Sequence, residues 1–159
     1  MRVIVLTAAT LAVALGAARA EPVQPVRLVP DEIAAKAAHS AGAGTSGIEG
    51  IRTTILEGDP SKPGLYTIRL DIPPNTTIAA HTHRDDRAAV VISGTWYFGY
   101  GRVATAAAVR PLTTGSFYTE PAGVAHFAMT KSEPVVVSIT GYGPTDTVYI
   151  DPADDPRHK

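Results

Sequence analysis

Residues 115–126 read Gly-Ser-Phe-Tyr-Thr-Glu-Pro-Ala-Gly-Val-Ala-His, and this stretch decides the fold. Ser116 to Glu120 has the aromatic and β-branched composition of a strand. The Pro-Ala-Gly that follows favours a tight turn. A return strand then begins near His126, so the turn would bring the imidazole of His126 back toward an earlier strand.

A second stretch, His81-Thr82-His83, ends a β-like run that begins at Ile78. Side chains alternate along a strand, so the two imidazoles should share one face. Two imidazoles in one pocket favour a metal site. A surface pair in an outward-facing turn is the alternative, because the charged residues Arg84 to Arg87 follow. Alone, the pair leaves both interpretations open.

The sequence between residues 50 and 150 consists of short runs rich in Val, Ile, Thr, Tyr and Phe. Turn compositions rich in Gly, Pro, Asn and Ser separate these runs. Regular spacing of strands and turns predicts an all-β sandwich or barrel. The predicted strands are Ile51 to Leu56, Leu65 to Ile72, Ile78 to His83, Ala88 to Tyr100, Ser116 to Glu120, His126 to Met129, Val135 to Thr140 and Thr147 to Ile150.

With its two motifs in order, the chain resembles the cupin superfamily over about residues 50 to 150. The family's first motif is G-x5-H-x-H-x(3,4)-E-x6-G and its second is G-x5-P-x-G-x2-H-x3-N. The resemblance implies a double-stranded β-helix, or jelly-roll barrel, preceded by an irregular extension. A narrower likeness is to small secreted bacterial cupins of unassigned activity. The matching residues are His81, His83 and Gly94 in the first motif, and Gly115, Pro121, Gly123 and His126 in the second.

Three positions depart from the family pattern. Asn75 replaces the leading Gly, and Asn tolerates the left-handed backbone that such a turn requires. Thr130 replaces the closing Asn, which we interpret as a structural change. Arg87 replaces the metal-binding Glu, and a guanidinium cannot ligate a metal.

The remaining ligand set is His81, His83 and His126, and three His are still a known metal arrangement. We therefore predict one divalent ion, with Zn, Fe, Mn, Ni and Cu all acceptable to imidazole. Arg87 has two interpretations. It clamps a carboxylate or phosphate beside the metal, or it forms a salt bridge to Asp85, Asp86 or Glu120 that only organises the loop.

Glu120 and Tyr118 share strand parity and complete the list of candidate catalytic residues. Glu120 replaces the missing ligand or acts as a general base, or else it lies outward on the rim. Tyr118 would reach the pocket. Trp96, Phe98 and Tyr100 alternate along another run, which predicts packing on one sheet face, with lining of a ligand cavity as the alternative.

Composition limits the chemistry. The chain has 159 residues, five His, no Cys and a formal net charge of −1. Without Cys there are no disulfides, thiolate nucleophiles or Cys-ligated clusters. The balanced charge argues against a nucleic-acid partner. His39 and His158 lie near the ends, where we expect them to be solvated.

Residues 1–20 have the pattern of a secretory signal peptide: Arg2, an apolar run from Val3, and the ending Ala18-Arg19-Ala20. Cleavage would leave 139 residues with a formal charge of −3, located in the periplasm or secreted, with no membrane association. Residues 21–49 are expected to be extended or flexible, residues 50–150 to form the cupin domain, and residues 151–159 to be a frayed tail.

Three hypotheses for function follow. The first is a metal-dependent enzyme acting on a small, anionic molecule. The second is a non-catalytic module that binds a metal or a small ligand. The third is a cupin retained for structure or dimerisation, and a homodimer is left open. Fold alone does not choose among them.

Overall fold

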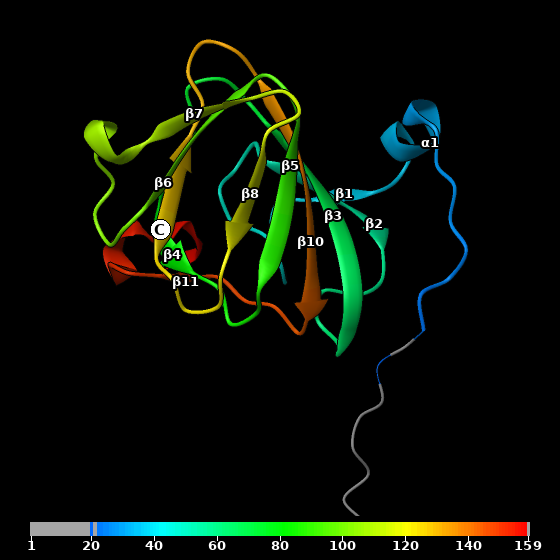
Figure 1. Cartoon of the computed structure of the whole chain (residues 1–159). Coiled ribbons are helices and arrows are strands. Elements are labelled where there is room, and N and C mark those ends of the chain that lie inside the picture. Colours follow the sequence, from blue (N-terminus) through cyan, green and yellow to red (C-terminus); the bar gives the residue numbers. More distant parts are fainter. Residues whose placement is uncertain (1–19, 21, 159) are drawn as a thin grey trace, which may run out of the picture.

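The computed structural model describes residue 20 and residues 22–158, and almost all of their regular structure is β. Two antiparallel sheets face each other (Figure 1). The first sheet has the order β1-β2-β3-β10-β5-β8 and the second β11-β4-β9-β6-β7. The predicted all-β architecture is confirmed.

The strands of the first sheet are β1 (Ala38–His39), β2 (Arg52–Glu57), β3 (Gly64–Ile72), β10 (Val135–Gly143), β5 (Arg87–Ser93) and β8 (Phe117–Glu120). Those of the second are β11 (Val148–Tyr149), β4 (Thr77–Thr82), β9 (His126–Met129), β6 (Thr95–Tyr100) and β7 (Arg110–Thr113). The helices are short: α1 (Pro30–Ala34) and the 3-10 turns η1 (Ala106–Ala108), η2 (Pro152–Asp154) and η3 (Pro156–His158).

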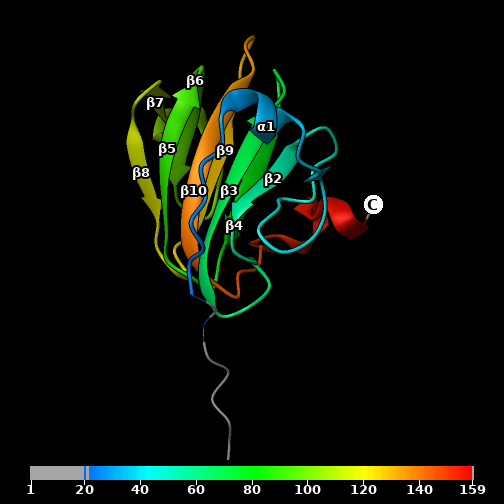
Figure 2. The same cartoon turned by 90° about the vertical axis from the view of Figure 1, so that its right-hand side faces the viewer.

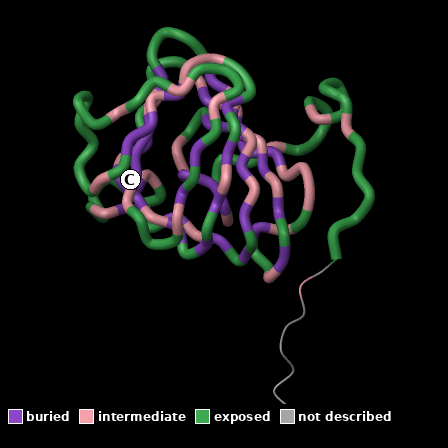
Figure 3. The backbone as a smooth tube through the Cα atoms, in the orientation of Figure 1, coloured by how far each residue is buried: buried purple, intermediate pink, exposed green. Residues whose placement is uncertain are grey.

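Alternating burial builds the core between the two sheets. Every second residue of β3 and β10 is buried, so the two long central strands present one apolar face inward. The second sheet contributes Trp96 and Phe98 of β6, which the sequence predicted to pack on a sheet face. Tyr100 continues the alternation but is 49% exposed, so the predicted packing ends before it. Figure 3 shows this buried interior running along the strands.

The N-terminal segment crosses the outer face of the first sheet. Figure 2 shows residues 22–34, including α1, in front of β10 and β3. The backbone N–H of Gln24 donates to Glu57 Oε1 at 3.1 Å. Among the described residues of this segment, Val23, Val26 and Val29 are exposed. The predicted extended conformation is therefore seen here, interrupted by one helical turn.

Two of the family departures have simple structural solutions. Asn75 adopts φ 56°, the left-handed conformation that the motif's Gly would supply. Thr130 is buried, accepts from the backbone N–H of Thr76 at 2.9 Å and donates to the carbonyl of Pro73 at 2.7 Å. Its hydroxyl ties the end of β9 to the start of β4, as the structural interpretation of this residue predicts.

Gly94→Ala should lower the free energy of unfolding by about 2–4 kcal/mol, combining positive-φ strain with overpacking. Gly94 has φ 78°, and a Cβ there would lie 2.4 Å from the carbonyl oxygen of Pro134. Gly115→Ala is the matched control, because Gly115 has φ 84° with open space around it. The control should lower the free energy of unfolding, measured in urea, by only about 1–2 kcal/mol. Equal losses of stability in the two variants would show that the contact between a Cβ at position 94 and the Pro134 carbonyl oxygen is unimportant.

Candidate metal centre

Strand pairing brings the first two histidines together. In the antiparallel pair β4 and β9, His81 lies directly opposite His126, and their ring centroids are 4.4 Å apart. His83 follows β4 with the same inward parity as His81, and its ring lies 4.9 Å from His81 and 5.1 Å from His126. All three residues are at most 5% exposed. One ligand nitrogen from each ring lies within 4.8 Å of the other two.

Backbone carbonyls fix the tautomer of each ring. His81 Nδ1 contacts the carbonyl of Ala79 at 2.7 Å, His126 Nδ1 that of Val124 at 3.0 Å, and His83 Nδ1 that of Asp146. A carbonyl can only accept, so each Nδ1 carries the proton and donates it. The three Nε2 atoms are thereby left unprotonated, and that is the state in which imidazole binds a metal.

Arg87 and Glu120 form a buried ion pair beside the three rings. They are cross-strand partners at the ends of β5 and β8, and both are at most 6% exposed. Arg87 Nε donates to Glu120 Oε2 at 2.6 Å, and Nη2 of the same guanidinium also contacts that oxygen. The salt bridge to Glu120, one of the two interpretations of Arg87, is therefore present. The outward rim position for Glu120 is wrong, because the cross-strand guanidinium holds the carboxylate inside.

The same pair touches the imidazoles. Arg87 Nη2 lies 2.7 Å from His83 Nε2 and donates to it, since that nitrogen is unprotonated. Glu120 Oε2 lies 3.6 Å from His83 Nε2 and 3.8 Å from His126 Nε2. His126 Nε2 has no hydrogen-bond partner, and neither has the buried Nη1 of Arg87. The cluster thus keeps hydrogen-bonding capacity unused, as an acceptor at His126 and as a donor at Arg87.

Burial keeps the imidazoles neutral. Desolvation, followed by the nearby His126, lowers the pKa of His81 to about 3. Desolvation and then the Arg87 guanidinium lower the pKa of His83, and desolvation lowers that of His126. At neutral pH all three rings are therefore ready to donate a lone pair.

The charged pair stays charged. Burial alone would raise the pKa of Glu120, but the guanidinium of Arg87 and the adjacent imidazoles hold it below the ordinary value. Burial, and then the Glu120 carboxylate, raise the pKa of Tyr118 well above its usual value. Tyr118 lines the same cavity as the histidines and keeps its proton there.

The cavity among these groups is small, at about 20 Å³. A cavity needs roughly 10–15 Å³ to hold one water, so this space suits an ion or a water and not an organic molecule. The residues that line it are Gly44, Ser46, Leu70, Ile78, His81, His83, Arg87, Trp96, Phe98, Tyr118, Glu120, His126, Ala128, Val137, Ile139 and Thr147.

Residues 44–46 form part of this wall, and we call them the strap. All three are buried, although the sequence predicted a flexible segment here. Thr147 Oγ1 donates to the carbonyl of Thr45 at 2.9 Å, and Tyr149 Oη donates to that of Ser46 at 2.7 Å. The prediction missed this packing because the strap consists of small polar residues. Their hydrogen-bond partners lie about 100 positions later in the chain, so the local sequence gives no sign of them.

The C-terminal tail also differs from its prediction. Residues 152–158 form η2 and η3, and Asp155 is buried rather than frayed. The Arg157 guanidinium donates to Asp155 Oδ2 at 2.6 Å and to the carbonyl of Thr147 at 2.8 Å. These bonds hold the tail beside the strap. His158 is 74% exposed in its side chain, as predicted.

Sequence reasoning missed Asp146, which orients His83 through its backbone carbonyl. The two residues are 63 positions apart, and the contact uses a backbone carbonyl, so no sequence motif indicates it. Asp85, in the bend after His83, is buried and accepts from Tyr66 Oη at 2.7 Å. This bond joins the bend to β3.

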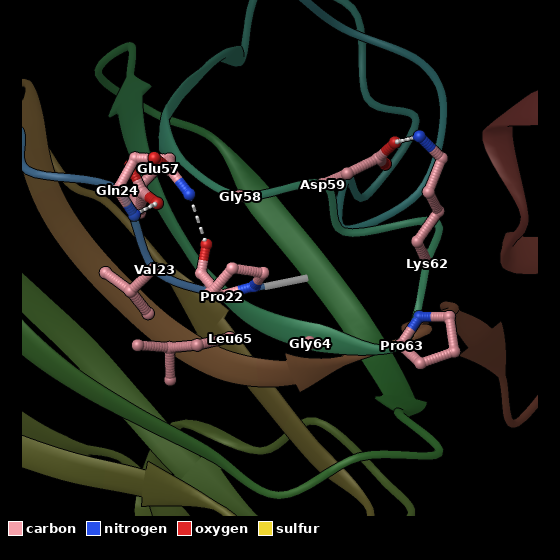
Figure 4. Close-up of a pocket in the computed structure, with 10 residues that line it drawn as sticks. All are labelled: Pro22, Val23, Gln24, Glu57, Gly58, Asp59, Lys62, Pro63, Gly64 and Leu65. Carbon is pink, nitrogen blue, oxygen red and sulfur yellow. Dashed lines mark hydrogen bonds and ion pairs between the residues drawn. The ribbon is translucent and has the colours of Figure 1, made fainter. Parts of the chain in front are cut away.

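A wider surface groove of about 380 Å³ lies away from the histidines, between residues 22–24 and residues 57–65 (Figure 4). Its charged side chains include Asp59 and Lys62, which pair with each other at 3.1 Å. No grouping of metal-ligating side chains other than the three histidines occurs among residues 22–158. The histidine cavity is therefore the candidate site.

Solved structures with the same arrangement of strands identify the fold. The polyketide cyclase RemF from Streptomyces resistomycificus aligns with TM-score 0.65 at 14% identity, covering 84% of this chain and 90% of that one. An RmlC-like cupin from Shewanella frigidimarina aligns with TM-score 0.54 at 14% identity, covering 76% and 92%. The chain has the cupin fold. A sugar phosphate isomerase of the cupin superfamily from Silicibacter pomeroyi also aligns, with TM-score 0.54, 17% identity and coverage of 74% and 76%.

The predicted cupin resemblance and jelly-roll fold are thereby confirmed. No known family model and no curated protein sequence matches this chain. The predicted signal peptide, residues 1–20, lies almost wholly outside the described residues. Among the residues that are described, no helix has the length and apolar character needed to cross a bilayer.

The donor set of the histidine cavity fits a divalent ion. Three neutral imidazoles have their Nε2 atoms unprotonated, one Nε2 is buried without a partner, and a carboxylate oxygen lies within 4 Å of two of them. His81, His83 and His126 would hold the ion. The hydrogen bond from Arg87 to His83 is the one contact that opposes binding.

The metal-free protein should lose stability as the pH falls from 6.5 to 5. Each buried imidazole has a folded pKa below its ordinary 6.5, so the unfolded state binds the proton first. The free energy of unfolding should fall by up to about 1.4 kcal/mol per pH unit for each ring. Urea unfolding at stepped pH measures this slope. His39→Ala, at an exposed position on β1, should keep the slope, and stability independent of pH would contradict the assignment.

Proposed function

We propose that this cupin binds one divalent metal ion through His81, His83 and His126. The observation that carries the proposal is the shared tautomer: three buried rings donate Nδ1 to backbone carbonyls and leave Nε2 for a common ligand. When bound, such an ion polarises an oxygen or activates a water. Zn, Fe, Mn, Ni and Cu all suit imidazole nitrogen, and the supply in the compartment would select among them.

The remaining cavity residues serve better as hydrogen-bond partners than as proton carriers. Glu120 is held ionised by Arg87 and is therefore a weak base. Tyr118 holds its proton tightly and can only donate a hydrogen bond at neutral pH. The free Nη1 of Arg87 offers a second donor, which suits an anionic ligand.

Cavity size favours metal binding over turnover of an organic substrate in this conformation. About 20 Å³ accommodates the ion or a water and no larger molecule. We therefore propose a metal-binding role, in sequestration or sensing, with a ligand of very few atoms. The enzyme hypothesis, action on a small anionic molecule, requires the strap to move. It stays an alternative because a polyketide cyclase and a sugar phosphate isomerase have the same fold.

The proposal places the protein in the periplasm or outside the cell, on the pattern of residues 1–20. The ligand partner is a small molecule or the metal itself. A homodimer stays a prediction.

Metal analysis tests the proposed centre. Purified mature protein should hold about one divalent ion per chain. His81→Ala and His126→Ala should each lose most of it, because every ring supplies one of three ligands. His39→Ala is the control, since His39 is exposed on β1, and it should keep the ion. Equal metal content in all four proteins would end the proposal.

Export is tested on protein made with its full N-terminus in a secreting bacterial host. The first residue of the exported protein should be Glu21, because small residues at Ala18 and Ala20 define the cleavage site. N-terminal sequencing gives the answer. An intact Met1 on protein confined to the cytoplasm would exclude export.

A further inference from the structure

The histidine centre has a fourth candidate ligand that comes from a different strand. Glu120, at the end of β8, places Oε2 3.6 Å from His83 Nε2 and 3.8 Å from His126 Nε2. Two ligand atoms on a tetrahedral ion with bonds near 2.1 Å are about 3.4 Å apart. The carboxylate therefore already has nearly the separation from two imidazoles that a shared ion requires.

Arg87 occupies the place that the ion would take. An unprotonated Nε2 has one lone pair, and in this structure the lone pair of His83 accepts Nη2 of Arg87 at 2.7 Å. A metal on His83 needs the same lone pair, so the two contacts exclude each other. The bond from Arg87 Nε to Glu120 makes no such demand, since a carboxylate has several lone pairs.

We propose that Glu120 is the fourth metal ligand and that Arg87 is an internal cation that competes with the metal for His83. In the metal-free protein the guanidinium bridges Glu120 and His83 and compensates the buried carboxylate. Metal binding displaces Nη2 from His83 while Nε keeps its bond to Glu120. This inference rests on the proposed metal centre and adds to it the identity of the carboxylate and the control of affinity.

A purely structural ion pair is the competing explanation. In that case Arg87 and Glu120 would only join β5 to β8, and neither residue would affect how the metal is coordinated. The two explanations differ in what the removal of each charge does to metal binding. Removal of Glu120 alone would leave Arg87 as an unpaired buried charge, whereas removal of Arg87 alone leaves Glu120 unpaired only until a metal ion binds. The experiment therefore compares Arg87→Gln with the double variant Arg87→Gln/Glu120→Gln, in which both charges are gone.

The measurement is Co²⁺ affinity by competition with a chromophoric chelator, together with the visible absorption spectrum of bound Co²⁺. Arg87→Gln should bind about tenfold more tightly than the natural chain, because His83 is free, and the double variant should then bind about 10- to 100-fold more weakly than Arg87→Gln. The spectrum should be alike in the natural chain and Arg87→Gln, and should change in the double variant when the carboxylate leaves. Arg69→Gln is the control, since it removes an Arg–Asp pair on β3 away from the histidines.

Unchanged or weaker binding in Arg87→Gln would overturn the competition. Equal affinity and spectrum in the two Arg87 variants would overturn Glu120 as a ligand while leaving the three-histidine centre intact. Loss of the proposed centre itself has a different signature: binding that His126→Ala does not weaken. If Arg87→Gln does not fold, Glu120→Asp provides the second measurement. Its retracted carboxylate should shift the Co²⁺ spectrum, and an unchanged spectrum would again exclude ligation.

Discussion

A guanidinium cannot lose its proton inside a protein, and this constraint organises the centre of the molecule. Once Arg87 is buried among imidazoles, a carboxylate must lie beside it, and Glu120 is the cross-strand partner that supplies one. Breaking such a pair from one side costs about 3–5 kcal/mol, because the other charge is left buried. Burial keeps the histidines neutral, and at His83 the guanidinium adds to this effect, since a nearby positive charge disfavours a second one.

The jelly roll explains how residues far apart in the chain reach this pair. β4 and β9 lie in one sheet and present His81 and His126 to each other, while β5 and β8 lie in the other and present Arg87 and Glu120. The two sheets close over a core of alternating apolar residues, so the inward side chains at one end of both sheets meet. The candidate metal centre thus depends on the contact between the two sheets, and no single strand contains it.

Sequence reasoning reached much of this through period-two alternation and two spaced motifs. Parity placed His81 and His83 on one face, and the Pro-x-Gly turn returned His126 toward them. The same reasoning left Arg87 and Glu120 undecided, because strand register, which makes them partners, depends on the whole sheet. It also missed the carbonyl of Asp146 and the strap, where the contacts are made by backbone atoms. Backbone carbonyls are identical at every residue, and only their placement distinguishes them.

The strap has a consequence for how the protein is handled. Residues 44–46 precede the long strands in the sequence and line the cavity. They accept hydrogen bonds from Thr147 and Tyr149 near the end of the chain, and Arg157 in turn donates to the carbonyl of Thr147. Two segments far apart in the sequence therefore pack together beside the histidine cavity. A truncation that removes residues 44–46 or Arg157 would therefore take away part of this wall or the bonds beside it, whereas residues 22–24 lie on a groove away from the histidines.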